Sequence, residues 1–293
     1  MRYPIAPAVL LASLALVQRP AFGQDMNVSV RSGHEVRTCE DLEVTFDDRP
    51  AVTAVDHLTA PGAQRLTVHA SRNGGVYVFG GTRQDFAISA CKAAAPASAG
   101  GGASSLEQVR ASLSGGTLTA AGPGSDGWVV YFIIDAPTQA TLDLDVSNGP
   151  IHVAKVAGAT TARAQNGPIK LVDVSGRVSA RTENGPIAYE GGSGTIELTA
   201  QNGPVSVLLA GDKWADGSLT ATAQNGPLKL KVPRGFASGV RVRSSPHSPW
   251  KCQGCDDGRR TWDDSSRSVE FGSGPVAVTL STVNGPVAVD MSR

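Results

Sequence analysis

The chain lacks an excess of charge of either sign and has few aromatic rings. Its 293 residues include 26 basic and 26 acidic side chains, and aromatic residues make up 5%. The balanced charge argues against a strongly basic nucleic-acid binder, which needs a clustered cationic surface. The 34 glycines follow no Gly-X-Y period, which excludes collagen, and 41% hydrophobic residues is too high for a disordered chain. This composition predicts a β protein with many turns.

Beyond its first residues the sequence also lacks an apolar run long enough to span a membrane. Near the start, Arg2 precedes an apolar segment from Ile5 to Val17, and the small residues Ala21 and Gly23 follow it. This arrangement predicts a secretory signal peptide over residues 1–23, with a mature chain that begins at Gln24. The alternative is an uncleaved anchor, but the apolar run is shorter than the roughly 20 residues that a spanning helix needs.

Cysteine is scarce, and its even number favours disulfides in an exported protein. The short separation of Cys252 and Cys255 favours their pairing with each other, which leaves Cys39 to pair with Cys91. A zinc site at Cys252, Cys255 and His247 would lack one ligand, and a redox dithiol would need a βαβ context. Both alternatives rank below the disulfide.

The dominant motif is a recurring Asn-Gly-Pro tripeptide. The first four copies are 18 residues apart and the next step is 23, because residues 212–217 add a loop; the copies begin at Asn148, Asn166, Asn184, Asn202, Asn225 and Asn284. Between the tripeptides, apolar and polar residues alternate with period two, as in half-buried strands. A fixed period of this kind predicts a repeat architecture.

An 18-residue strand repeat fits either an antiparallel meander of hairpins or a β-solenoid of stacked coils. Asn-Gly is a strong hairpin signal, but the next residue of such a turn must donate its N–H, and here it is always proline. A solenoid corner does not need that donor. The sequence therefore predicts an all-β fold: a parallel β-solenoid, β-helix-like repeat of roughly six coils with an N-terminal β module.

These motifs resemble a known family. The Asn-Gly-Pro-Ile copies, the segment Arg72-Asn73-Gly74-Gly75-Val76 and the segment Val232-Pro233-Arg234-Gly235-Phe236 are similar to the bacterial β-strand-repeat envelope family labelled putative adhesin, a domain of unknown function. The resemblance covers roughly residues 66–293. It implies an exported, non-catalytic surface or periplasmic protein. The Cys252–Cys255 insert and an Ala/Gly-rich linker depart from the plainest form of the family.

The chain divides into four predicted parts. After the signal peptide, residues 24–92 form a disulfide-closed N-terminal β module, residues 93–105 form the Ala/Gly-rich linker, and residues 106–293 form the strand-repeat domain. An insert at about 233–272 interrupts the repeat. The apolar run Trp128–Ile134 predicts a buried strand.

The sequence predicts no catalytic residue, cofactor or metal site. The fingerprint-like Gly122-x-Gly124-x-x-Gly127 precedes a predicted strand instead of following one, and the five histidines are scattered. Position seven after successive asparagines holds Lys155, Asp173 and Gly191, so no acidic ladder forms for glycan cleavage. The repeated asparagines are interpreted mainly as corner residues, with a ligand-binding row as the alternative.

The segment that breaks the repeat is the candidate interaction surface. It holds Trp250 and Trp262 beside Arg259 and Arg260, and Trp and Arg are enriched at binding hot spots. The favoured interpretation of these rings is a lid over the open flank of the solenoid, and the binding surface is the hypothesis set against it. We expect a structural or interaction protein, adhesin-like, at the bacterial cell surface or in the periplasm, whose partner is an envelope protein or glycan. An envelope-stress or regulatory binding module and a glycan-active β-helix enzyme are the alternatives.

Overall fold

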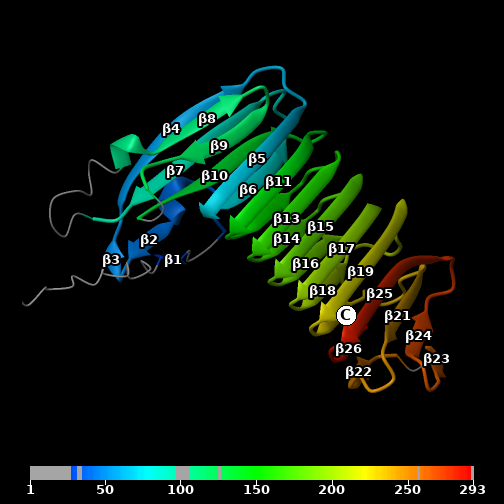
Figure 1. Ribbon diagram of the computed structural model, residues 1–293. Helices are drawn as coiled ribbons and strands as arrows, with labels where there is room; N and C mark the ends of the chain where they lie inside the picture. The colour runs from blue at the N-terminus through cyan, green and yellow to red at the C-terminus, as the bar shows by residue number, and fades with distance from the viewer. Residues whose placement is uncertain (1–27, 32–34, 97–105, 125–126, 256–257, 292–293) are drawn as a thin grey trace, which may run out of the picture.

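The protein is an all-β molecule, as the sequence predicts (Figure 1). The computed structural model describes residues 28–31, 35–96, 106–124, 127–255 and 258–291. The predicted signal peptide and most of the predicted linker lie outside these residues. In the described part of the chain, no helix is long and apolar enough to cross a membrane.

Two large sheets contain most of the strands. Sheet I has 11 strands in the spatial order β22 (Trp250–Gln253), β26 (Val287–Asp290), β20 (Leu228–Lys231), β18 (Val205–Leu209), β16 (Ile187–Gly191), β14 (Ile169–Val172), β12 (Ile151–Ala154), β6 (Gly75–Gly81), β10 (Trp128–Pro137), β7 (Phe86–Ala94) and β4 (Val52–Ala60). Sheet II has 12 strands in the order β23 (Arg259–Trp262), β24 (Arg267–Phe271), β21 (Gly239–Ser244), β25 (Val276–Asn284), β19 (Gly217–Asn225), β17 (Gly194–Asn202), β15 (Arg177–Asn184), β13 (Thr160–Asn166), β11 (Thr141–Asn148), β5 (Arg65–Asn73), β9 (Thr117–Ala121) and β8 (Arg110–Ser114).

Successive repeats pair in parallel and in unchanged register. In sheet I, Ile151 is paired with Ile169, and Ile169 with Ile187. In sheet II, the asparagine that ends each strand is paired with the asparagine one repeat later. Each repeat thus adds one strand to each sheet, and the parallel pairing excludes the hairpin meander.

Alternating side chains build the core between the two sheets. In β14, Ile169 and Leu171 are buried while Lys170 is exposed. In β15, Val178 and Ala180 belong to the same buried cluster as the β14 residues. The period-two pattern of the sequence therefore corresponds to one apolar face on each sheet, and both faces turn toward a common core.

Glycine is required at the Asn-Gly-Pro corner because consecutive backbones approach closely there. A Cβ atom on Gly185 would lie 2.2 Å from the carbonyl oxygen of Gly167. The N–H of Gly167 donates to the carbonyl of Asn184 at 3.0 Å. The proline contributes only its carbonyl, as where Pro168 accepts from the N–H of Ile151 at 2.9 Å. The missing proline N–H therefore does not break the bonding between repeats.

The predicted insert does not interrupt the stack. Strand β19 pairs directly with β25, and β20 pairs with β26, although many residues separate them along the chain. The intervening segment adds β21 and β24 to sheet II and β22 to sheet I. The insert is therefore a continuation of both sheets at their C-terminal end.

The N-terminal segment contributes to the same two sheets and covers one of them. Strands β5 and β6 pair with β11 and β12, so strands from both sides of the predicted linker share sheets I and II. A small antiparallel sheet III consists of β1 (Val28–Arg31), β2 (Glu43–Phe46) and β3 (Arg49–Pro50), with the 3-10 turn η1 (Cys39–Asp41) before β2. Phe46 of β2 and Leu42, which precedes β2, pack in one buried cluster with Tyr131 and Ile133 of β10. Sheet III thus lies on the outward face of sheet I.

Candidate functional site

The repeated asparagines form a ladder of side-chain hydrogen bonds along one corner of the molecule. The Nδ2 group of Asn166 donates to Oδ1 of Asn148 at 2.8 Å, and Asn184 donates in the same way to Asn166 at 2.9 Å. The ladder continues through the remaining copies with distances of 2.9–3.1 Å, up to Asn284. These amides bind one another, as the corner interpretation expects.

The four residues of the candidate interaction surface lie on two different sheet edges. Trp250 is in β22 at the end of sheet I, whereas Arg259, Arg260 and Trp262 are in β23 at the end of sheet II. The side chain of Trp262 is 55% exposed, and that of Arg259 is 79% exposed. The structure brings the last three together on one short, exposed strand.

Trp250 differs from Trp262 in its surroundings. Its indole Nε1 donates to Oγ of Ser244 at 2.6 Å, and its ring packs against the main core. The Trp262 ring instead lies under the guanidinium of Arg267, whose Cζ is 5.0 Å from the ring centroid. Trp250 has the environment of a packing residue, and Trp262 has that of a surface residue.

An acidic side chain holds the arginines of this edge. Glu270 of β24 forms ion pairs with Arg259 and with Arg241. Hydrogen bonds from Arg259 and then Arg241 lower the pKa of Glu270, so it stays ionised next to β23. Arg260 belongs to the same strand and is exposed.

Both predicted disulfides are present. Cys39 is bonded to Cys91 with a Cα–Cα distance of 5.4 Å, and Cys252 is bonded to Cys255 with 5.8 Å. The first joins η1 to β7 and so fixes sheet III on sheet I. The second closes the turn that follows β22. Neither pair is available as a thiolate ligand, and the described residues contain no group of three His, Cys, Asp or Glu placed to hold a metal.

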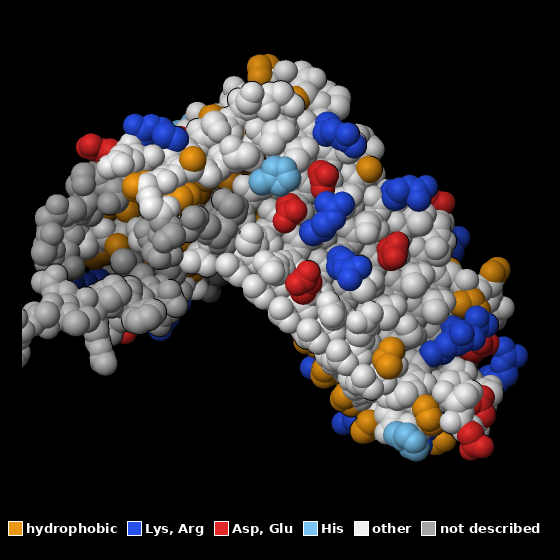
Figure 2. Space-filling model, in the orientation of Figure 1, with side chains coloured by type: hydrophobic (Ala, Val, Ile, Leu, Met, Phe, Trp, Pro, Cys, Tyr) orange, Lys and Arg blue, Asp and Glu red, His pale blue; other side chains and the backbone are white. Residues whose placement is uncertain are grey.

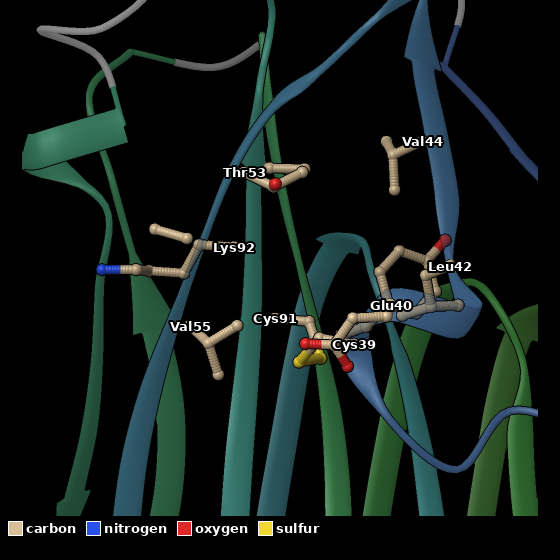
Figure 3. Close-up of a pocket in the computed structure, with 11 residues that line it drawn as sticks. Cys39, Glu40, Leu42, Val44, Thr53, Val55, Cys91 and Lys92 are labelled. Carbon is tan, nitrogen blue, oxygen red and sulfur yellow. A yellow bond between two sulfur atoms is a disulfide. The ribbon is translucent and has the colours of Figure 1, made fainter.

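Sequence reasoning missed a pocket beside the first disulfide. Its volume is about 100 Å³, and it lies between sheet III and the edge of sheet I. Figure 3 shows Thr53 and Val55 of β4 on one side, Leu42 and Val44 on the other, and the disulfide between them. The lining residues come from four separate segments of the chain. The predicted pairing of Cys39 with Cys91 is the one sequence feature that indicates that two of these segments are in contact.

A second hollow lies farther along the outward face of sheet I, where sheet III does not cover it. It has a volume of about 250 Å³ and crosses β14, β16, β18 and β20. Lys170, Lys229 and Lys231 are exposed around it, while Val172 and Leu208 are partly buried in its floor. The alternation of apolar and polar residues predicts an outward face of sheet I, but it does not predict where sheet III stops covering that face.

His152 lies where the cover of sheet III ends. It is only 6% exposed, and its ring contacts the Phe79 ring edge-on at a centroid distance of 5.5 Å. Burial, and then the cation of Lys170, lower its pKa from 6.5 to about 4. The imidazole is therefore neutral at pH 7.

Opposite charges alternate on the outward face of sheet II. Figure 2 shows positive and negative side chains interleaved over its middle strands. One such pair joins Arg163 to Asp143 at 2.8 Å, and both side chains are about half exposed. Acidic and basic side chains are therefore neighbours on these middle strands.

Comparison with known proteins finds similar solved structures. No protein-family model and no curated protein matches the sequence. A putative cell adhesion protein from Clostridium sporogenes aligns with 83% of this chain and 100% of its own, at 10% identity and a TM-score of 0.34. A putative adhesin from Bacteroides fragilis aligns with 82% of this chain and 96% of its own, at 12% identity and a TM-score of 0.39. The name of the second is the label of the family that the sequence motifs resemble, whereas the first is named a cell adhesion protein.

Proposed function

We propose that this chain is an exported, non-catalytic β-solenoid that acts as an adhesin-like interaction protein at the bacterial envelope. The observation that carries the proposal is the constant register of the repeat. Each 18-residue unit adds one strand to sheet I and one to sheet II, with its corners aligned on those of its neighbours. Such a stack holds extended outer faces in a fixed shape, which suits recognition of large partners.

The solenoid interpretation rests on how the two sheets are connected. Strand β13 leads through one Asn-Gly-Pro corner into β14, and β14 leads through the corner at Gly176 into β15. The chain thus passes from sheet II to sheet I and back to sheet II, and this path corresponds to one coil per repeat. The interior of each coil is apolar, as at Leu171 and Val178.

Export is supported by the two disulfides, since such bonds persist in oxidising compartments. Together with the predicted signal peptide, they support our proposal that the mature chain lies outside the cytoplasm. Mass spectrometry of the protein from its native host should show a chain that begins at Gln24 and has no free thiol. A chain that retains Met1, or four thiols that react without a reductant, would contradict export.

For the interaction surface we propose the exposed residues of β23, namely Arg259, Arg260 and Trp262. A partner here is an envelope protein or glycan, because an exposed Trp with flanking Arg offers both apolar contact and charged hydrogen bonds. Trp250 is better explained as a packing residue because of its bond to Ser244.

The test uses the mature protein immobilised against envelope fractions of its host. Trp262→Ala and Arg260→Ala should abolish retention of the bound envelope component and leave the melting temperature unchanged. Thr261→Ala, a neighbouring exposed position of the same strand, is the matched control and should retain it. Trp250→Ala should lower the melting temperature by several degrees. Unchanged retention by Trp262→Ala would reject the β23 surface.

A further inference from the structure

We propose that the edge of β4 is a strand-addition site that receives an extended, basic and apolar peptide segment of another protein. The proposal deepens the interaction role inferred above and rests on it, but it concerns the opposite end of the molecule from β23. The added strand would extend sheet I beyond β4, and one of its side chains would enter the pocket beside the Cys39–Cys91 disulfide.

The first argument is that β4 is an unprotected edge. It has nine residues and pairs with β7, and among the described strands none pairs with its other side. The other three sheet ends have short edge strands with basic residues: β22 with Lys251, β23 with Arg259 and Arg260, and β8 with Arg110. Strand β4 contains no Lys, Arg or Pro. Proteins commonly use Lys, Pro and short lengths to block pairing at an edge, and β4 has none of these. Its one acidic residue, Asp56, is paired with Lys92 of the neighbouring strand β7.

The second argument is the exposed apolar surface of β4. Val52 is 37% exposed and Val55 is 38% exposed, and these are two of the five large hydrophobic residues that are exposed in the described part of the chain. Because successive side chains alternate, Val52 and Val55 lie on opposite faces of the strand. An added strand would cover both with its own alternating side chains.

The third argument is the pocket that adjoins this edge. In Figure 3 the pocket lies between β4 and β2, with Val55 on one wall and Val44 on the other. Its volume of about 100 Å³ approaches the ~150 Å³ of an apolar cavity that accepts benzene, which is the scale of one aliphatic side chain. In strand addition, backbone hydrogen bonds supply affinity and such pockets supply specificity.

Charge indicates the kind of peptide. Residues 28–60, which form sheet III and β4, contain seven acidic and three basic side chains, a formal charge of −4 in a chain whose overall charge is zero. Glu40 and Lys92 both line the pocket, and the Lys92 ammonium is paired with Asp56 of β4 at 2.8 Å. A strand with lysines among its apolar residues complements this end, whereas the β4 edge of a second copy would bring like charges together.

The experiment measures peptide binding to the full mature protein by fluorescence anisotropy. The probe is a labelled nine-residue peptide, as long as β4, in which valine alternates with threonine or lysine. Two further probes carry N-methyl groups on alternate backbone nitrogens, in opposite phases. Because only one edge of the peptide can pair with β4, one phase should weaken binding by about tenfold or more, and the other should leave it nearly unchanged. Equal effects of the two phases would overturn strand addition.

Protein variants locate the site. Val55→Lys places a cation at the pocket wall and should weaken binding of the basic probe by about tenfold or more. Val283→Lys makes the same change at an exposed valine of β25, in sheet II, and should leave binding unchanged. If Val55→Lys lowers the melting temperature, Thr53→Lys, at an exposed residue of the same face, replaces it.

Other outcomes overturn the proposal in distinct ways. No binding of the unmodified probe, or equal binding to Val55→Lys and Val283→Lys, would show that β4 does not receive a strand. A dimer in sedimentation that Val55→Lys dissociates would identify a second copy as the occupant. Retention of the envelope component at β23 without peptide binding at β4 would reject this inference and leave the proposed function intact.

Discussion

The side-chain amide of Asn184 donates to Asn166 at 2.9 Å and accepts from Asn202 at 3.1 Å. It therefore connects three successive repeats through a single residue. Asn184→Ala removes both bonds at an exposed corner, and we expect a loss of about 1–2 kcal/mol in the free energy of unfolding, near 1 kcal/mol for each bond. Urea denaturation measures this loss. Gln201→Ala, at an exposed position of β17 outside the ladder, should change stability by less than about 0.5 kcal/mol. Equal effects of the two substitutions would show that the ladder contributes nothing.

Gly185→Ala should lower the free energy of unfolding far more than Asn184→Ala, since its Cβ would lie 2.2 Å from the carbonyl oxygen of Gly167. The backbones of neighbouring repeats would have to separate, and we expect a loss above about 3 kcal/mol or failure to fold. Gly81→Ala is the matched control, because a Cβ there meets no atom within 4 Å. Thermal melting of both variants decides the matter, and a Gly185→Ala protein as stable as Gly81→Ala would contradict the close corner contact.

Removal of one whole repeat should preserve the fold. Deleting residues 166–183 brings Asn184 into the place of Asn166, opposite Asn148, with every side chain on its original face. Deleting only residues 166–174 removes a corner and misaligns the strands that follow, because a shift in register moves apolar side chains to the wrong face. Circular dichroism and melting should show a cooperative transition for the first deletion alone. Equal folding of the shorter deletion would refute the coil interpretation.

Acid should destabilise the protein through His152. Its folded pKa of about 4 lies below the ordinary 6.5, so the unfolded state binds more protons between these values. The contribution of the neutral ring is fully present above pH 6.5 and is lost as the pH falls toward 4. We expect this loss to reach about 1–3 kcal/mol, after allowance for solvent screening. Urea titrations at several pH values should show a flatter dependence for His152→Gln. An unchanged slope would indicate that other groups control acid stability.

The sequence predicted local features well because they depend on local physics. The strand alternation, the buried run at Trp128–Ile134 and both disulfides are confirmed, since periodicity and cysteine spacing report directly on burial and proximity. The domain division at residue 92 stays a prediction. Strands β5 and β6 pair with β11 and β12 across a long stretch of chain, and periodicity within a segment carries no information on which distant strand it joins.

The candidate site shows the same limit. Trp250 and Trp262 are near each other in the chain, yet they lie on the edges of different sheets, because the turn after β22 leads from sheet I to sheet II. The pocket at the opposite end combines η1, β2, β4 and β7 with Tyr131 of β10. No motif marks these residues as neighbours, and only the docking of sheet III on sheet I makes them so.

The direct pairing of β19 with β25 has a consequence for how this molecule can change in length. The side chains of Asn225 and Asn284 are hydrogen-bonded at 2.9 Å although 59 positions separate them. The pairing of two adjacent strands therefore does not depend on the length of chain that connects them. An insertion can begin at one corner and end at the next without changing the strand pairing of the neighbouring repeats. Adding whole repeats, in turn, would lengthen the two sheets by about 4.8 Å for each repeat, which is the spacing of paired strands. The number of repeats and the length of an inserted segment are therefore two independent variables of this architecture.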